Sequence, residues 1–363
     1  MTSSAALEEV PEGVEDITAA WVEAVLAPRL PDVAVASIDV APVRDGAGLV
    51  GQVAHVVPHY DVAPDGAPTA LIVKLPTRDA QIRGFANGMG MYEREGRFYA
   101  DIAPRVELRV PRVLHNACDP AADRYCLVME AVDVGQRINQ LGGVPPKRAA
   151  EVIATIGAFH AAWHDHPMLN EWTWLPRPSD PLNKVLAPRF EGAWPHFERD
   201  YAHRVPGDTA HWVQEFAPQM NAWWDSKDAP PYTIVHGDFR LDNMLWTPAG
   251  ELVLLDWQIV QCGFGLYDVA YFIVTNLKVD DRRTHEDALL ALWRDTMLAG
   301  GADPGSPDEV HRLYRETVLF WATGVACATA EFGSTPEGRT LVDTLVERAF
   351  TAAADLNVGE VLT

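Results

Sequence analysis

The chain has 363 residues, enough for about two domains, and its 29 basic and 51 acidic residues give a net charge of −22. A surface this acidic repels the phosphates of nucleic acids and the headgroups of anionic membranes, so the charge disfavours both as partners. With 48% hydrophobic and 22% charged residues, the composition predicts a globular protein with a packed core and excludes a disordered or fibrous chain.

The sequence carries no signal for export or membrane insertion. Its four cysteines form no C-x-x-C pair and are too few to staple a chain of this length. The first residues lack the basic and apolar regions of a signal peptide, and no run reaches the ~18 apolar residues of a membrane span. We therefore expect a soluble, cytoplasmic protein with free thiols.

Short apolar runs separated by Gly, Asp and Pro occupy the first third of the chain, a pattern typical of antiparallel strands and tight turns. The expected elements, after an acidic leader at 1–34, are strands at 53–57 and 71–75, a helix at 88–102 and a buried strand at 125–129. This part of the chain is predicted to form a small β-rich unit.

From about residue 147 the pattern changes to long helical stretches. The expected helices cover residues 147–165, 184–201, 208–226, 284–299, 307–330 and 336–355. One β-type segment interrupts them, because residues 232–257 hold two short apolar runs around a turn-forming Thr-Pro-Ala-Gly at 247–250. The sequence therefore predicts an α+β fold whose larger, mostly helical second part carries a β-hairpin.

Polar side chains gather at the open end of this hairpin. His-Gly-Asp-Phe-Arg-Leu-Asp-Asn at 236–243 enters its first arm, and Asp256 follows its second arm. Pairing of the arms brings Asn243 close to Asp256. An amide oxygen and a carboxylate suit Mg²⁺, which takes its other ligands from water and phosphate. Asp238, on the loop that enters the hairpin, could accept a proton from a hydroxyl beside a metal-bound phosphate.

Other interpretations compete for these residues. Asp238 and Asp242 can cap turns, and Asn243 can sit in an Asx-turn. A calcium loop of the EF-hand type fails at its third and sixth positions, and His236 has no second histidine at the spacing of a zinc site. The order and spacing of the four residues, ending in Asp256, favour the catalytic interpretation over turn capping.

The spacing His-x-Asp-x-x-x-x-Asn, followed by an Asp after a strand, resembles the small-molecule branch of the protein-kinase-like superfamily, the aminoglycoside phosphotransferase and choline kinase-like enzymes. The resemblance implies a bilobal fold, with a nucleotide-binding lobe at 1–130, a helical lobe at 131–363 and a hinge at about 127–133. In such a hinge, Met129 and Glu130 would offer backbone groups to the base of the nucleotide.

The resemblance also assigns roles to the polar residues. Asp238 would be the catalytic base, and Asn243 and Asp256 would hold magnesium. His236 would support the catalytic loop, and Asp268 would brace it from the start of a helix.

The resemblance requires a phosphate-covering loop and a phosphate-binding lysine in the first lobe. Gly46, Gly48 and Gly51 have the G-x-G-x-x-G spacing just before the strand 53–57, and glycines let a backbone approach phosphates closely. Lys74 ends an apolar strand, where it resembles the family's phosphate-binding lysine. The alternative for Lys74 is a solvated strand end.

A buried glutamate is indicated by helical periodicity. Glu95 falls in the same stripe of the helix 88–102 as Met91, Phe98 and Ile102, so it faces the core. A carboxylate on a buried face needs a cation, and Lys74 is the natural candidate. The alternative is that Glu95 reaches out to solvent.

The short segment between Asp256 and Asp268 disfavours a protein as the phosphate acceptor. Only 11 residues lie between Asp256 and Asp268, too few for the activation segment with which a protein kinase docks a peptide, and Asp256 is followed by Trp-Gln rather than Phe-Gly. Substrate contacts are expected from the helical regions 160–226 and 307–332. The aromatic residues of 160–226 are more typical of a core, but any that line a cleft would favour a bulky, partly apolar alcohol over a highly cationic aminoglycoside. The sequences at 95–99, 256–258 and 268–272 also resemble the ecdysteroid-kinase-like and macrolide-phosphotransferase-like branch.

We therefore expect a phosphotransferase that moves the γ-phosphate of ATP or GTP, with Mg²⁺, to a hydroxyl of an antibiotic, steroid-like compound, amino alcohol or sugar. The alternatives are a catalytically silent, pseudokinase-like nucleotide sensor and a metal-dependent hydrolase. Residues 71–112 hold eight basic and five acidic residues, a charge of +3 that suits a nucleotide. We expect the acidic leader (1–45) and tail (280–363) to present solvated surfaces. Neither the acceptor nor the oligomeric state is indicated.

Overall fold

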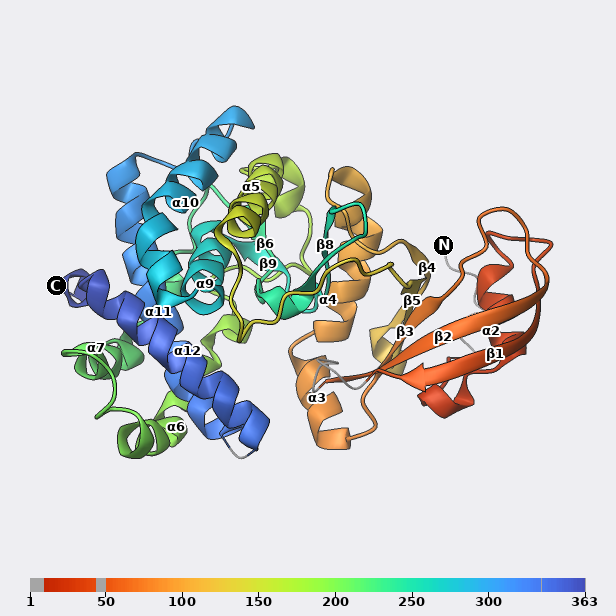
Figure 1. The fold of residues 1–363 in the computed structure, drawn as a ribbon, viewed down its shortest axis with the longest axis horizontal. Coiled ribbons are helices and arrows are strands. Elements are labelled where there is room, and N and C mark those ends of the chain that lie inside the picture. Colours follow the sequence, from red (N-terminus) through yellow and green to blue (C-terminus); the bar gives the residue numbers. More distant parts are fainter. Residues whose placement is uncertain (1–9, 44–49, 334, 363) are drawn as a thin grey trace. The chain divides into compact units, whose positions relative to one another are not determined.

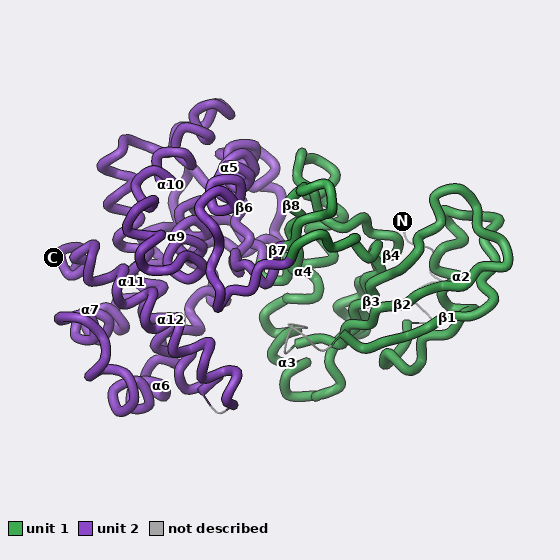
Figure 2. The backbone as a smooth tube through the Cα atoms, in the orientation of Figure 1, with its two compact units in different colours: residues 1–136, 245–259 green, residues 137–244, 260–363 purple. Residues whose placement is uncertain are grey.

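The structure, a computed structural model, combines sheet and helix as the predicted α+β class requires (Figure 1). It describes residues 10–43, 50–333 and 335–362. The chain forms two compact units, which are residues 1–136 with 245–259 (unit 1) and residues 137–244 with 260–363 (unit 2) (Figure 2). The lobe boundary near residue 130 stays a prediction, and most of the hairpin segment belongs to unit 1, although the sequence predicts it within the second lobe.

Unit 1 is built on a five-stranded antiparallel sheet with the strand order β1-β2-β3-β5-β4. The strands are β1 (Ala34–Pro42), β2 (Gly51–Val62), β3 (Leu71–Pro76), β4 (Val113–Asp119) and β5 (Arg124–Glu130). Successive side chains of a strand point to opposite faces, so alternate residues such as Ala54 and Val56 form a fully buried apolar face. The three predicted strands are confirmed, and β4 is an edge strand that the sequence did not reveal.

The charge distribution predicted that the acidic leader is a solvated surface. The structure shows that part of the leader is packed into the core. Its residues Ala19–Leu26 form helix α2, whose first turn is capped by the Thr18 hydroxyl, which accepts from the Trp21 N–H at 3.2 Å. Trp21, Val22 and Leu26 are buried in the apolar core that includes one face of the sheet. Burying a large apolar side chain contributes about 1.5–3 kcal/mol, and the described acidic side chains before β1 stay exposed or half-buried, so this packing leaves the carboxylates in contact with water.

The α-helix predicted at 88–102 is shorter in the structure, and a second helix precedes it. Helix α4 (Met91–Arg97) continues into a π-helical turn, η2 (Phe98–Ile102). A separate helix, α3 (Ala80–Gly88), precedes it. Gly90 separates the two helices with a φ of +63°, a conformation that glycine adopts without strain.

The predicted hairpin is formed by β7 (Met244–Trp246) and β8 (Leu252–Leu254). Its turn is closed by the Gly250 N–H, which donates to Thr247 O at 2.8 Å. Within unit 1, Trp246 and Gln136 exchange backbone hydrogen bonds of 2.9 Å. The segment that leaves β5 is therefore fastened to the hairpin.

Unit 2 is mostly helical. Its α-helices are α5 (Pro146–Trp163), α6 (Leu186–Asp200), α7 (Thr209–Phe216), α8 (Met220–Ser226), α9 (Leu266–Asn276), α10 (Val279–Ala299), α11 (Pro307–Phe332) and α12 (Pro336–Asp355). The predicted helical stretches are all present, with 208–226 divided between α7 and α8. Strands β6 (Thr233–Val235) and β9 (Gln261–Gly263) form a two-stranded antiparallel sheet.

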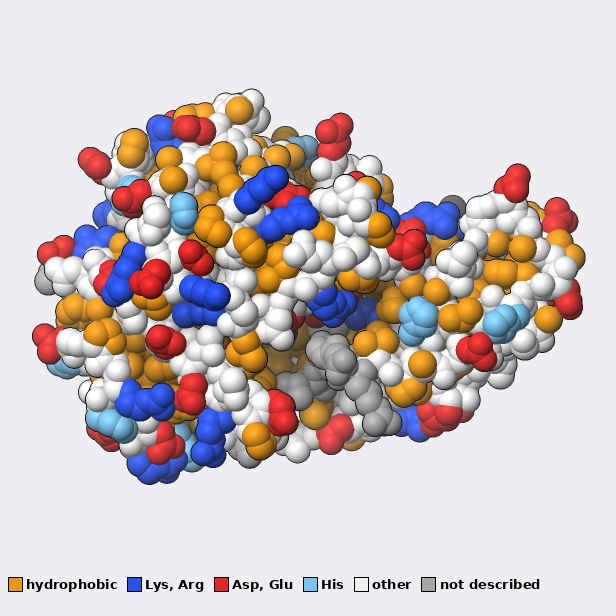
Figure 3. Space-filling view, viewed as in Figure 1, with side chains coloured by type: hydrophobic (Ala, Val, Ile, Leu, Met, Phe, Trp, Pro, Cys, Tyr) orange, Lys and Arg blue, Asp and Glu red, His pale blue; other side chains and the backbone are white. Residues whose placement is uncertain are grey.

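Helix α11 packs against α6, α9 and α12. Buried faces of α11 and α12 contain apolar residues such as Phe320 and Phe350, so the acidic tail is solvated only on its outer sides. On the face shown in Figure 3, acidic and basic side chains are interspersed over unit 2. Within the described residues, no helix combines the length and apolarity that crossing a membrane requires. The four cysteines are unpaired, as predicted.

Candidate active site

One buried carboxylate in unit 2 holds the loop that follows β6. Asp268, in the first turn of α9, accepts from the backbone N–H of His236 at 2.7 Å and from that of Gly237 at 3.0 Å. His160 of α5 lies 3.3 Å from the same carboxylate and accepts from the Trp293 indole at 3.1 Å. Asp268 therefore makes the bracing contacts that the resemblance implies, while its importance for activity stays a prediction.

His236 is fully buried at the beginning of this loop. Its Nδ1 lies 3.3 Å from the backbone N–H of Asp238, which fits an acceptor role for that ring nitrogen. Gly237, between them, has a φ of +90°, a conformation that side-chain-bearing residues rarely adopt. The His-Gly-Asp sequence thus shapes a tight loop that presents Asp238.

Two donors bind one oxygen of the Asp238 carboxylate. Arg240 Nε and Asn243 Nδ2 each donate to Asp238 Oδ2 at 2.9 Å, and Asn243 Nδ2 also reaches Asp238 O at 2.8 Å. Arg240 Nη1 donates to Asp242 Oδ2 at 2.9 Å. Burial alone would raise the pKa of Asp238, but the Arg240 charge and these hydrogen bonds hold that pKa below its usual range.

Arg240 is the charged partner of Asp238 that the sequence analysis did not single out. It lies two residues after Asp238 and two before Asp242, so a cation flanked by acids on both sides was the available signal. Its guanidinium presents several N–H groups in a fixed plane, which allows it to bind both carboxylates at once. The structure therefore adds Arg240 to the candidate catalytic loop.

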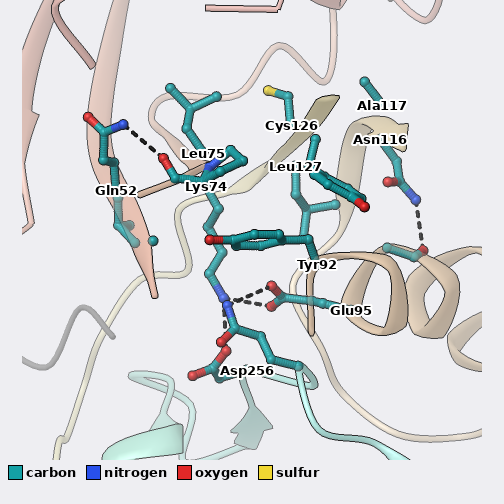
Figure 4. Close-up of a pocket in the computed structure, with 16 residues that line it drawn as sticks. Gln52, Lys74, Leu75, Tyr92, Glu95, Asn116, Ala117, Cys126, Leu127 and Asp256 are labelled. Atoms are coloured by element: carbon teal, nitrogen blue, oxygen red, sulfur yellow. Dashed lines mark hydrogen bonds and ion pairs between the residues drawn. The ribbon is translucent and has the colours of Figure 1, made fainter. Parts of the chain in front are cut away.

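In unit 1, Lys74 bridges two carboxylates (Figure 4). Its Nζ donates to Glu95 Oε1 at 2.6 Å and to Asp256 Oδ1 at 3.0 Å. The predicted Lys74–Glu95 ion pair is confirmed, and Glu95 is buried as its periodicity indicated. Burial favours a neutral amine, but the two carboxylates raise the pKa of Lys74 above its usual value, so Lys74 stays charged.

Asp256 occupies a strained backbone position. Its φ is +63°, in the left-handed region that non-glycine residues seldom adopt. The next side chain, Trp257, is fully buried and stacks on Phe98 of η2 with 3.8 Å between ring centroids and an interplanar angle of 5°. The stacked ring fixes the chain beside Asp256, whose carboxylate can then reach Lys74.

A small cavity of about 40 Å³ adjoins this ion-pair network within unit 1. Side chains from β2, β3, α4 and β5 line it, together with Asp256 (Figure 4). Glu95 Oε2 also accepts from Gln258 at 3.4 Å. The cavity therefore has a charged wall on which a polar or anionic group could bind beside Lys74.

The sheet face opposite α2 carries the predicted hinge residue Met129. By register, Ile72 of β3 pairs with Met129 of β5, and the neighbouring pair Val53 and Lys74 lies on the same face. Ile72 and Val53 are half-buried, which leaves this apolar face partly open. Such a surface can accept the flat ring of a base. Contact between the nucleotide and Met129 stays a prediction.

Glu130 is already engaged within unit 1. Its carboxylate pairs with Arg109 at 2.7 Å and accepts from the Arg112 N–H at 3.0 Å, and its own N–H donates to Arg112 O. The predicted contact of Glu130 with the base stays untested, but these bonds give Glu130 a structural role in shaping the segment after β5.

Only part of the predicted glycine loop can be described. Gly46 and Gly48 lie outside the described residues. Gly51 is the first residue of β2 and pairs with Pro76 of β3. A Cβ atom at Gly51 would come within 3.2 Å of Leu75 O, so the absence of a side chain here permits close strand pairing.

The two predicted magnesium ligands belong to different units, and their approach stays a prediction. Asn243 donates to Asp238 through its amide nitrogen, so its amide oxygen could coordinate a metal ion. Asp256 would supply a carboxylate oxygen. The described part of the chain has no cluster of three or more His, Cys, Asp or Glu residues suited to a metal. Magnesium takes only one or two oxygens from protein, so this donor set fits it.

Most aromatic residues predicted as core or cleft in 160–226 are core. Trp163, Phe197, Trp223 and Trp224 are all buried. Trp172, Trp174, Trp194 and Trp212 are half-buried, so they alone among the predicted tryptophans could still line a cleft.

The fold is that of a kinase-like phosphotransferase. A family model described as the phosphotransferase enzyme family matches residues 65–310, about two thirds of the chain. The chain belongs to this family.

Solved structures share this fold over nearly their whole length. A candidate aminoglycoside phosphotransferase from Ralstonia eutropha JMP134 is 16% identical with a TM-score of 0.54, over 93% of this chain and 98% of that one. The GDP complex of aminoglycoside 2'-phosphotransferase-IIIa is 12% identical with a TM-score of 0.51, over 90% and 98%. Choline kinase from Cryptosporidium parvum Iowa II is 12% identical with a TM-score of 0.51, over 94% and 92%. Likeness at these identities shows the fold alone.

Two curated proteins match short segments. Acyl-CoA dehydrogenase family member 11 from Gallus gallus is 40% identical over 62 residues, and member 10 from Mus musculus is 51% identical over 41 residues. These matches cover 15% and 11% of this chain but only 8% and 4% of those proteins. The chain therefore corresponds to a small part of each.

Proposed function

We propose that the protein transfers the γ-phosphoryl group of ATP or GTP to a hydroxyl group of a small molecule. The observation that carries this proposal is the state of Asp238, a carboxylate kept ionised by Arg240 on a loop that Asp268 braces. A carboxylate so placed can accept a hydrogen bond from an alcohol and orient it. The predicted cytoplasmic location would supply the nucleotide.

In this proposal, the acceptor hydroxyl donates its hydrogen bond to Asp238. The hydroxyl oxygen attacks the γ-phosphorus, the bond from that phosphorus to the β,γ-bridging oxygen breaks, and the hydroxyl proton passes to Asp238. Phosphoryl transfer has a loose transition state, so orientation and charge stabilisation matter more than base strength. The lowered pKa of Asp238 agrees with that role, because it keeps the carboxylate ionised rather than strongly basic.

The remaining residues bind the nucleotide. Lys74, fixed by Glu95, would bind its phosphates, and the glycine loop that ends at Gly51 would cover them. Asn243 and Asp256 would hold Mg²⁺, which neutralises phosphate charge when bound. These roles rest on the family assignment and on the donor chemistry described above.

Replacement of the candidate base tests the proposal. Asp238→Asn should abolish phosphate transfer to any acceptor in a mixed panel of alcohols, sugars, steroids and antibiotics, detected by mass spectrometry. Binding of ATP and GTP with Mg²⁺, measured by thermal shift, should remain. Asp225→Asn is the matched control, because Asp225 is exposed in the same unit and pairs only with Lys184 among the described contacts. Full activity of Asp238→Asn would refute the assignment.

A further inference from the structure

Tyr271 is the one residue of α9 that is not buried. It lies three residues after Asp268, so the two side chains project from neighbouring positions of the helix surface. Asp268 holds the backbone of the catalytic loop, while the charges of Asp238 and Arg240 both influence the Tyr271 hydroxyl. The single partly open position of a core helix therefore lies beside the candidate base.

Trp321 on α11 lies against Tyr271, and the ring of each covers one face of the other. The two rings stack with 4.1 Å between centroids and an interplanar angle of 19°. Trp321 is also the only residue from Thr317 to Thr323 that is not buried. Its Nε1 donates to Tyr267 O at 3.0 Å, which fixes the indole. Two partly exposed aromatic rings are thus held rigidly on otherwise buried helix segments.

Small side chains continue this surface along α11. Gly324 and Ala328 follow Trp321 by three and seven residues, a spacing that places them on the same side of the helix. Both are partly exposed, and neither has a side chain long enough to cover the indole. The missing side chain of Gly324 leaves the adjoining edge of the indole uncovered, since a Cβ there would lie 3.7 Å from Trp321 Cε3.

The charges around Tyr271 are already paired with one another. The two carboxylates that act on Tyr271, those of Asp238 and Asp242, both bond to Arg240 at 2.9 Å. A polycationic acceptor would have to compete with this guanidinium for them. A neutral ring or compact apolar group gains instead from packing against the outer faces and edges of the stacked Tyr271–Trp321 pair, without disturbing the ion pairs.

We propose that Tyr271 and Trp321 form an acceptor platform and that the acceptor is a neutral alcohol with a ring or compact apolar body next to its hydroxyl. The platform holds the apolar body, and the hydroxyl reaches Asp238. This inference rests on the proposed function, since it names the substrate class for the same site.

Binding can be tested without turnover on protein labelled with 5-fluorotryptophan. Three probes differ only at one end: 4-phenylbutan-1-ol, butane-1,4-diol and 4-aminobutan-1-ol. In the full chain with a nucleotide and Mg²⁺, 4-phenylbutan-1-ol should shift the ¹⁹F resonance of Trp321 saturably, whereas the diol should not. Loss of a resonance in Trp321→Phe assigns the signal, and half-buried Trp212 of α7 is the internal control. An unmoved Trp321 signal, or a larger response to 4-aminobutan-1-ol, would overturn the proposed class.

Kinetics separate this inference from the proposed function. Trp321→Ala should raise the KM for 4-phenylbutan-1-ol about tenfold, which corresponds to ~1.4 kcal/mol, and Trp212→Phe should leave it unchanged. Thermal unfolding of each variant verifies the fold. If Asp238→Asn abolishes transfer but Trp321→Ala leaves KM unchanged, the platform is refuted and the phosphotransferase stands. A Trp321 shift without any transfer to the probes would retain the surface and count against the reaction.

Discussion

Removal of the Arg240 guanidinium should move the acid limb of the activity profile. Arg240→Gln deletes the charge that donates to Asp238 Oδ2 at 2.9 Å and to Asp242 at 2.9 Å. A hydrogen bond to a charged group contributes about 1.5–3 kcal/mol. The Asp238 side chain is 27% exposed, so solvent screening favours the lower end of that range.

The direction of the pH shift depends on which form of the Asp238 carboxyl group Arg240 stabilises. Arg240 favours the ionised carboxylate and lowers the pKa of Asp238, so the wild-type protein should stay active well into acid. The variant should lose activity at higher pH, by about one pH unit for each ~1.4 kcal/mol removed. The same ion pair stabilises the fold above the unfolded pKa of the aspartate, and that contribution disappears as pH falls through the folded pKa.

The assay is the pH dependence of kcat/KM for phosphate transfer, supported by ¹³C NMR titration of the Asp238 carboxyl in the nucleotide-free protein. Arg204→Gln is the matched control, because it removes an exposed pair with Asp343 in the same unit. Arg240→Lys should restore part of the effect, since it keeps the charge but loses the planar fork. Identical acid limbs in Arg240→Gln and the wild type would refute the reasoning.

Three further predictions concern other parts of the chain. Glu95→Gln should raise the KM for the nucleotide about tenfold, because the lysine of β3 loses a buried charged partner at 2.6 Å, whereas Glu93→Gln on the outer side of α4 should have little effect. Gly265→Ala should lower activity and destabilise the protein by about 1–3 kcal/mol in urea unfolding, because its Cβ would lie 2.6 Å from the imidazole that contacts Asp268. The control is Gly192→Ala, whose Cβ meets nothing within 4 Å and which should be neutral or stabilising. Arg348→Met should cost about 2–4 kcal/mol of stability, since this buried guanidinium donates to three backbone carbonyls at 2.8–2.9 Å; a loss below about 1 kcal/mol would contradict that role.

Local patterns in the sequence determined much of the fold and part of the candidate site. Alternating apolar residues defined strands of unit 1, and the Thr-Pro-Ala-Gly turn located the hairpin. Helical periodicity placed Glu95 on a buried face and thereby predicted its pair with Lys74. These features depend on residues close together in the chain, where the geometry of strands and helices fixes which side chains share a face.

Packing decided what local patterns could not. The acidic leader contains α2, which packs into the apolar core beside the sheet, because its apolar residues can be buried while the acidic side chains around them stay at the surface. Likewise, α9 is a core helix that opens only at Tyr271, and no short-range pattern distinguishes that position.

The sequence by itself therefore predicted the hairpin and the Lys74–Glu95 pair, which the structure confirms, and a catalytic motif whose role stays a prediction. Only the tertiary structure brought Asp256 to Lys74, 182 residues away, and stacked Trp321 on Tyr271. It also revealed how Arg240 divides its guanidinium between two carboxylates. The physical reason is that contacts between distant segments depend on the path of the whole chain, whereas propensity and periodicity act over a few residues.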